Sequence, residues 1–321
     1  MPIPRDGKVG ISLQPRDLSI LRTLFECRVF TTTNAASLFF NGRKEAAKKR
    51  LQILKRAGLI AERPRAPSEP AVLYLTRKGL ETLRDAGILN EYPAFDLPTL
   101  LRRAQVGNST IRHELEVMDV KVAFHESLRS QRHLSIPKFS TWPLLNSFTV
   151  SHPKGKGAKV LVLPDGYFEI HETTPAREAK IHRFFLEVDR STESLDTLVS
   201  RAASYLAHYR SGGFANSKGK ARSTFRTLPF RVLIVVPSRI RSDTLAHALR
   251  RNSPPIHSFA WFATRDDIHG NPLGPVWRRP FDFDDPEPQR HSLLPKGDKR
   301  DSEYHGEAPP FGHDSASGDG K

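Results

Sequence analysis

Residues 230–236, "FRVLIVV", limit the fold of this chain more than any other stretch. They hold one arginine among six apolar residues, so the strand they predict is apolar on both faces. Such a strand lies inside a sheet that helices cover on both sides. Amphipathic patterns at 195–209 and 241–251 predict two of the covering helices. The sequence therefore predicts an α/β fold with a central mixed sheet.

The α/β domain is expected to span residues 108–265. A helix over 108–129 opens it, because apolar residues recur there on one helical face. Strands are predicted near 134–139, in "KVLVLPDGYFEI", in "IHRFFLEVD" and near "IHSFAWFA". With the helices after residues 195 and 241, the expected order is α-β-β-β-α-β-α-β.

Residues 12–90 predict a smaller unit of three helices, a β-hairpin and a fourth helix. The first helix spans 15–27, Thr32 or Thr33 caps the second, and Gly58 ends the third. Two short apolar strands flank the segment "RPRAPSEP", and the last helix begins at Thr76. This order resembles a winged helix-turn-helix, and the resemblance implies that the third helix enters the major groove of DNA.

Basic residues gather in this N-terminal unit. Residues 1–90 hold seventeen bases and eight acids, a balance of +9 within a chain whose net charge is +15. Such a balance favours a polyanionic partner, here double-stranded DNA. A solvated basic helix, or one that docks a protein, is the alternative. The residues expected to contact DNA are Arg43, Lys44, Lys48, Lys49 and Lys55 in the third helix and Arg63 and Arg65 in the wing.

The remaining segments are expected to be a connector and a solvent-exposed tail. Residues 91–107 are predicted as a connector, and 281–321 as a disordered tail with ten acids and five bases. The single cysteine, Cys27, excludes an intramolecular disulfide and suits the cytoplasm. No apolar run is long enough to span a membrane. The sequence leaves open whether the protein forms a homodimer.

A group of carboxylates is predicted at one end of the sheet. Alternation along a strand places Phe185, Glu187 and Asp189 on one face. A hairpin centred near Ala176 would place Asp165 opposite Glu187. Three carboxylates so close together need a cation or a raised pKa, and Mg²⁺ held by Asp165 and Glu187 would meet that need. Ion pairs with Arg183, Arg190 or Arg201 are the alternative.

Pro164-Asp165, followed by Glu187-Val188-Asp189 on the next strand, resembles the PD-(D/E)xK nuclease superfamily. The resemblance implies that Asp165 and Glu187 bind Mg²⁺ and are catalytic, and Asp189 is expected to join them as a further ligand or a water-orienting base. Asp189 departs from the pattern, because it stands where the family has lysine. Lys180 or Arg201 could replace that lysine, and Glu114 could be a further ligand.

Several longer segments resemble the bacterial replication-relaxation family over about residues 12–262, among them "RDLSILRTL", "RHELEVMDVKVAF" and "FFLEVDRSTESLDTLVSRAASYLAHY". The resemblance implies a DNA-handling protein of a plasmid or other mobile element, which acts in replication, relaxation or mobilisation beside other proteins of those processes. Three functions stay open within it: a DNA-binding accessory protein, a Mg²⁺-dependent endonuclease or nickase, and a transcriptional regulator.

Overall fold

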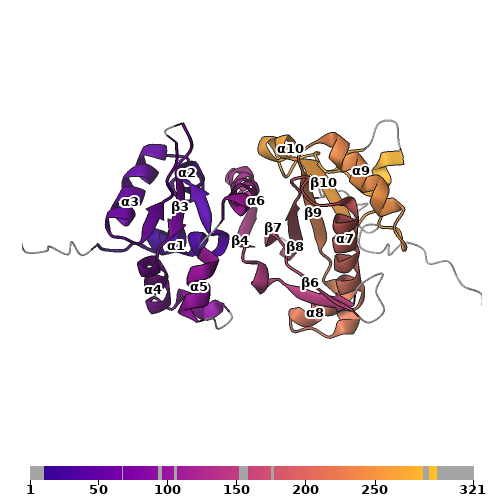
Figure 1. The fold of residues 1–321 in the computed structure, drawn as a ribbon. Helices are drawn as coiled ribbons and strands as arrows, with labels where there is room; N and C mark the ends of the chain where they lie inside the picture. The colour runs from indigo at the N-terminus through magenta and orange to yellow at the C-terminus, as the bar shows by residue number, and fades with distance from the viewer. Residues whose placement is uncertain are drawn as a thin grey trace, which may run out of the picture.

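The structure is a computed structural model that describes residues 11–66, 68–92, 96–104, 107–151, 158–174, 177–284 and 289–294. The N-terminal elements form one end of the molecule and the larger sheet with its helices forms the other, with α6 (Asn108–Leu128) between them (Figure 1). Within the described residues, every helix is too short or too polar to cross a membrane.

The N-terminal unit has the predicted order of helices and hairpin, with one further strand. β1 was not predicted, because three residues are too few to show an alternating pattern. It joins the hairpin in an antiparallel sheet of order β1-β3-β2. The elements are α1 (Pro15–Cys27), β1 (Val29–Thr31), α2 (Thr32–Phe40), α3 (Lys44–Arg56), β2 (Ile60–Glu62), β3 (Val72–Leu75) and α4 (Arg77–Asp85).

The ends of these helices follow from local side chains. The prediction that Thr32 or Thr33 caps α2 is wrong by one residue: Thr31 Oγ1 accepts the Asn34 backbone N–H at 3.1 Å. The Asn34 side chain accepts the Thr31 N–H in return, at 2.8 Å. Gly58 ends α3 with a φ of +72°, which glycine adopts without strain.

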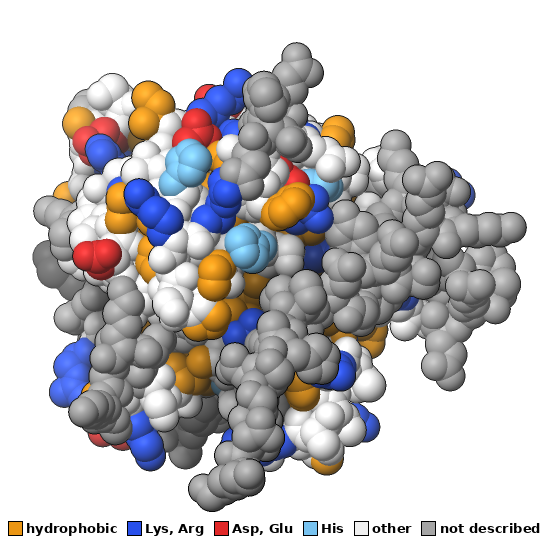
Figure 2. Space-filling model, turned by 90° about the vertical axis from the view of Figure 1, so that its right-hand side faces the viewer, with side chains coloured by type: hydrophobic (Ala, Val, Ile, Leu, Met, Phe, Trp, Pro, Cys, Tyr) orange, Lys and Arg blue, Asp and Glu red, His pale blue; other side chains and the backbone are white. Residues whose placement is uncertain are grey.

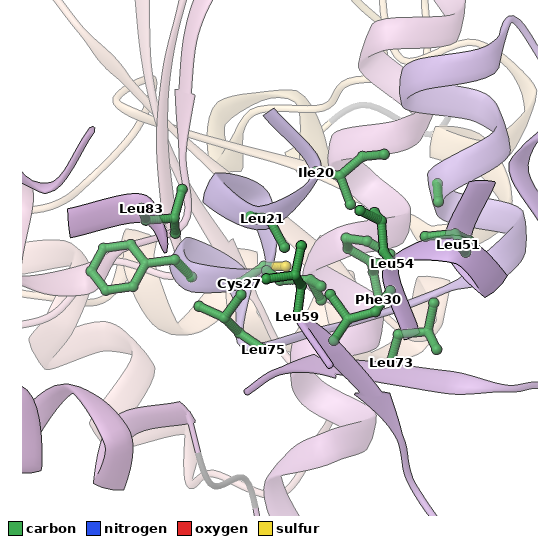
Figure 3. Close-up of a cluster of buried hydrophobic side chains, with 14 of the residues drawn as sticks. Ile20, Leu21, Cys27, Phe30, Leu51, Leu54, Leu59, Leu73, Leu75 and Leu83 are labelled. Carbon is green, nitrogen blue, oxygen red and sulfur yellow. The ribbon is translucent and has the colours of Figure 1, made fainter. Parts of the chain in front are cut away.

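A single apolar cluster holds the N-terminal unit together. Leu21, Cys27 and Phe30 lie at its centre with no exposed surface. Leu51 and Leu54 of α3 point into the same cluster from one side of their helix (Figure 3). Because α3 buries this stripe, Lys44, Lys48 and Lys49 are left exposed, whereas Arg50 pairs with the buried Asp17.

The predicted connector contains more structure than expected. It holds all of α5 (Leu97–Ala104), and the 3-10 helix η1 (Ile88–Glu91) ends at its first residue. Leu100 and Leu101 of α5 pack against the N-terminal cluster. The two apolar residues give α5 a face to bury, so this part of the chain is not a simple linker.

The larger domain is a five-stranded mixed sheet in the order β10-β9-β8-β7-β4. β4, β7 and β8 are antiparallel neighbours, and β8, β9 and β10 are parallel ones. The mixed α/β fold is therefore confirmed. The main elements are α6 (Asn108–Leu128), β4 (Leu134–Ser140), β7 (Gly166–Thr174), β8 (Arg177–Val188), α7 (Leu195–Arg210), β9 (Arg231–Val236), α9 (Arg239–Arg250) and β10 (Ala260–Thr264).

The segment "KVLVLPDGYFEI" forms two strands where one was expected. Pro164 and Asp165 separate β6 from β7, and β6 pairs with β5 in a two-stranded sheet of its own. Proline lacks the N–H that a central strand must donate, which explains the break. The smaller elements here and later in the chain are η2 (Pro143–Leu145), β5 (Phe148–Ser151), β6 (Lys159–Val162), α8 (Gly213–Ser217), η3 (Arg222–Thr227) and α10 (Arg265–Gly270).

Helices cover both faces of the five-stranded sheet, as the apolar strand β9 requires. Phe184 and Leu186 belong to a buried cluster with α6 and α10. Phe185 belongs to a second cluster, with α7 and α9. The predicted alternation along β8 is confirmed, and it directs Glu187 toward α7.

The C-terminal prediction is wrong at its start. Residues 281–284 lie in η4 (Pro280–Asp284), and 289–294 lie against the domain. Leu293 and Trp277 are fully buried, and Asp282 accepts hydrogen bonds from Arg279 and His291. The segment was predicted to be disordered because acids and prolines dominate its composition and outnumber the few residues that anchor it. Residues 295–321 lie outside the described part of the chain.

Candidate functional site

The outer side of α3 presents a basic surface. Arg43, Lys44, Lys48 and Lys49 are all exposed, as the position of the buried stripe predicts. Glu45, in the first turn, is the acid on the same helix. A helix of this kind can meet phosphates with Lys and Arg while its shape fits a groove.

The expected wing residues are engaged within the protein. Glu62 of β2 binds Lys55 Nζ at 2.7 Å and Arg65 Nε at 2.9 Å. Hydrogen bonds from Lys55 and then Arg65 lower the pKa of Glu62. Arg63 follows β2 and is partly exposed. The basic surface therefore centres on the start of α3 rather than on Lys55 and the hairpin.

Asp165 lies where the sequence predicts it, across from the end of β8. The hairpin register pairs Gly166 with Leu186, which places Asp165 beside Glu187 at the next position. Asp165 Oδ2 accepts the Val188 backbone N–H at 2.8 Å, and Oδ1 lies 2.8 Å from His113 Nε2 of α6. Burial opposes the charged imidazole, but the hydrogen bond and charge of Asp165 raise the pKa of His113.

Glu187 is almost fully buried, with 3% of its surface exposed. Its Oε1 accepts the Tyr205 hydroxyl at 2.5 Å, and its Oε2 lies 2.9 Å from Arg201 Nη1. Arg201 also binds Glu193 at 2.8 Å. Burial first, and the charge of Asp165 second, raise the pKa of Glu187 to about 8, against the effects of Arg201 and Tyr205.

Asp189 belongs to a separate set of contacts. Its Oδ1 accepts the Ser191 N–H at 2.8 Å, and its Oδ2 accepts from Arg241 Nε at 2.6 Å. Arg241 also donates to the Glu193 carbonyl at 2.8 Å. These bonds tie the end of β8 to the first turn of α9. Asp189 therefore has a structural role in this arrangement.

The arginines expected near the acids have different partners. Arg201 reaches Glu187, as the ion-pair alternative predicted. Arg190 instead binds Glu116 at 3.3 Å, and Arg183 lies opposite Glu169 in the hairpin.

The other residues considered for the metal site also lie in structural contacts. Lys180 pairs in register with Glu172 near the hairpin turn, away from Asp165. Glu114 binds Arg28 of the N-terminal unit at 3.1 Å. Burial raises the pKa of Glu114, and Arg28 opposes the shift.

These contacts decide how well the acids fit Mg²⁺. Both carboxylate oxygens of Asp165, Glu187 and Asp189 have partners within the protein. In the described part of the chain, no three His, Cys, Asp or Glu side chains gather closely enough to hold a metal ion. The arrangement therefore suits ion pairs rather than a hard cation.

Three residues that contact the acids were not predicted from the sequence: His113, Tyr205 and Arg241. Tyr205 lies four residues after Arg201, so α7 presents both to Glu187. That spacing was a readable signal. The positions of His113 and Arg241 depend on how α6 and α9 pack on the sheet, which the sequence does not show.

Comparison with known proteins gives one match. A family model described as replication-relaxation matches residues 21–223, more than half of the chain. No curated protein and no solved structure matches the chain. The match covers α3 and all three acids at the end of the sheet.

Proposed function

The chain belongs to the replication-relaxation family, and from that premise we propose that it is a DNA-binding protein acting in the replication or relaxation of a plasmid or other mobile element. We interpret residues 12–90 as a winged helix in which α3 contacts double-stranded DNA. The domain with the five-stranded sheet is then a nuclease-like scaffold that does not cleave.

One observation carries this proposal: the exposed cations at the start of α3. Lys44 and Lys48 lie one turn apart, and both are exposed beside the stripe that buries Ala47, Leu51 and Leu54. Phosphate contacts of this kind give affinity with little sequence preference. Arg43 and Lys44, nearest the helix start, are the residues best placed for base edges.

Duplex binding of the variant Lys44→Glu/Lys48→Glu tests the proposal. Fluorescence anisotropy across a salt series should show affinity lowered by roughly tenfold or more and a salt slope smaller by about 2. The matched control is Arg102→Glu/Arg132→Glu, which changes the charge equally at exposed sites outside α3. Equal weakening by both variants would show only general attraction to a basic protein and would contradict the role of α3.

A Mg²⁺-dependent endonuclease remains the second candidate, because the register brings Asp165 beside Glu187. The ion pairs at both residues favour the non-catalytic function. We expect no nicked product when supercoiled plasmid is incubated with the protein and Mg²⁺. Nicking that disappears in Asp165→Ala would overturn the non-catalytic assignment. A transcriptional regulator would instead show tight binding confined to its own promoter.

A further inference from the structure

A hollow on the outer side of α9 has no part in the proposed contact with double-stranded DNA. Its volume is about 700 Å³, within the range of ligand sites. The buried side of α9, with Leu245 and Leu249, packs on the sheet, so the residues of the hollow face outward. The lining residues are Ile240, Asp243, Thr244, His247, Arg250, Arg251 and His257.

The charge of this hollow is positive. Arg250 and Arg251 contribute two cations, and Asp243 is paired with Arg278 at 3.2 Å. Figure 2 looks onto this side of the molecule, where Lys, Arg and His side chains gather beside hydrophobic ones. A hollow of this charge selects an anionic ligand.

Exposed apolar side chains border the same cations. Ile240 is 79% exposed and Phe281 is 59% exposed, which is unusual for side chains of this size. The ring of Phe281 lies 6.4 Å from that of His257, at 86°, and the Phe281 backbone N–H donates to the His257 carbonyl at 3.0 Å. In the described part of the chain, His257 Nδ1 is buried without a hydrogen-bond partner.

We propose that this hollow binds single-stranded nucleic acid, with phosphates at Arg250 and Arg251 and a base against Phe281 or Ile240. Cations interleaved with aromatic and apolar surfaces are the chemistry that unpaired strands require, because every base has a face that can stack. A duplex hides these faces, and its convex outline does not enter a hollow. An acidic peptide could satisfy the charge but would leave Phe281 unused.

Two single variants test the site with a labelled oligo-dT of about twelve nucleotides. Phe281→Ala removes the stacking surface and should weaken binding by about fivefold or more. Arg251→Glu reverses an exposed charge and should weaken it by about tenfold. The matched controls are Leu161→Ala, with a 57% exposed side chain on β6, and Arg132→Glu, and both should bind like the wild type.

The outcomes separate this proposal from the one for α3. Phe281→Ala and Arg251→Glu should leave duplex affinity unchanged, and Lys44→Glu/Lys48→Glu should leave oligo-dT affinity unchanged. Oligo-dT binding that survives both hollow variants would overturn the proposal. Equal competition by poly-glutamate would also overturn it, because charge alone would then explain the binding.

Discussion

Removal of Arg201 tests whether Glu187 is held by an ion pair. In Arg201→Met the carboxylate, 4% exposed, loses its cation but stays under α7. Breaking a buried charged pair costs about 3–5 kcal/mol, and at pH 9, where Glu187 is ionised, we expect about 3 because the Arg201 side chain is 29% exposed. At pH 6, where the carboxyl is protonated, the loss should be smaller. For a domain of this size the melting temperature should fall by about 6–12 °C. Arg201→Met/Glu187→Leu should recover most of that loss, because no unpaired charge remains.

The loss should depend on pH. The folded protein raises the pKa of Glu187 from its usual 4.5 to about 8, so it holds the proton more tightly than the unfolded chain does. The stabilising contribution of that proton is complete below about pH 4.5 and is lost as the pH rises toward 8. Without Arg201 the pKa rises further, so the gap between variant and wild type should widen from pH 6 to pH 9.

Thermal melts followed by circular dichroism, with and without Mg²⁺, measure both effects. Glu193→Gln is the control, since it removes the more exposed partner of Arg201 and leaves the buried pair in place. A gap that does not change with pH, or Mg²⁺ that restores the stability of Arg201→Met, would refute the ion-pair reasoning. Restoration by Mg²⁺ would favour a metal site instead.

Two further substitutions probe the scaffold. Gly79→Ala should destabilise the N-terminal unit by about 1–3 kcal/mol in a urea melt, because a Cβ there overlaps the Leu59 carbonyl oxygen; Gly270→Ala, where the space is open, is the control. Asp282→Asn should destabilise the protein by about 2 kcal/mol at pH 6, because the wild-type pKa is lowered to about 2, against the effect of burial, by hydrogen bonds that include one from His291. The stability that the Asp282 carboxylate provides is present above about pH 4 and lost as the pH falls toward 2, so melts should show the gap closing over that range.

Patterns along the chain predicted most of the fold. Alternation along β8 and the apolar run of β9 are local signals, and they gave the strands and their buried faces correctly. The hairpin register was predictable because the pairs from Gly166 with Leu186 to Glu172 with Lys180 are symmetric about residue 176, the centre that the sequence suggested. Short elements such as β1 and α5 were not predicted, since their stability comes from packing against distant residues.

The candidate site was less predictable than the sheet that carries it. The sequence placed Asp165 and Glu187 side by side, but it could not show which cations reach them. Arg201 reaches Glu187 from α7, and His113 reaches Asp165 from α6, which packs on the other face of the sheet. Such contacts depend on helix packing, which has no signature in local spacing. Ion pairs and a metal site therefore look alike in the sequence and differ only in three dimensions.

The helix α6 packs against both the N-terminal unit and the larger domain, and so fixes the two proposed binding surfaces relative to one another. Its Met118 is buried in the N-terminal cluster and its Phe124 in the cluster under the sheet. Asn34 of α2 donates to Asp119 of α6 at 2.8 Å, which fixes the two parts further. α3 and α9 therefore lie at opposite ends of the molecule (Figure 1) and cannot approach one another.

This separation gives a last prediction, which rests on both proposals. A forked DNA, with a duplex for α3 and an unpaired arm for the α9 hollow, should bind more tightly than duplex and oligo-dT bind separately, because the second contact becomes intramolecular. Such coupling can raise affinity by about 10²–10⁴. The gain should vanish when the arm is too short to span the molecule, and it should fall by about fivefold or more in Phe281→Ala. A fork that binds no better than its duplex at every arm length would show that the two surfaces do not act together.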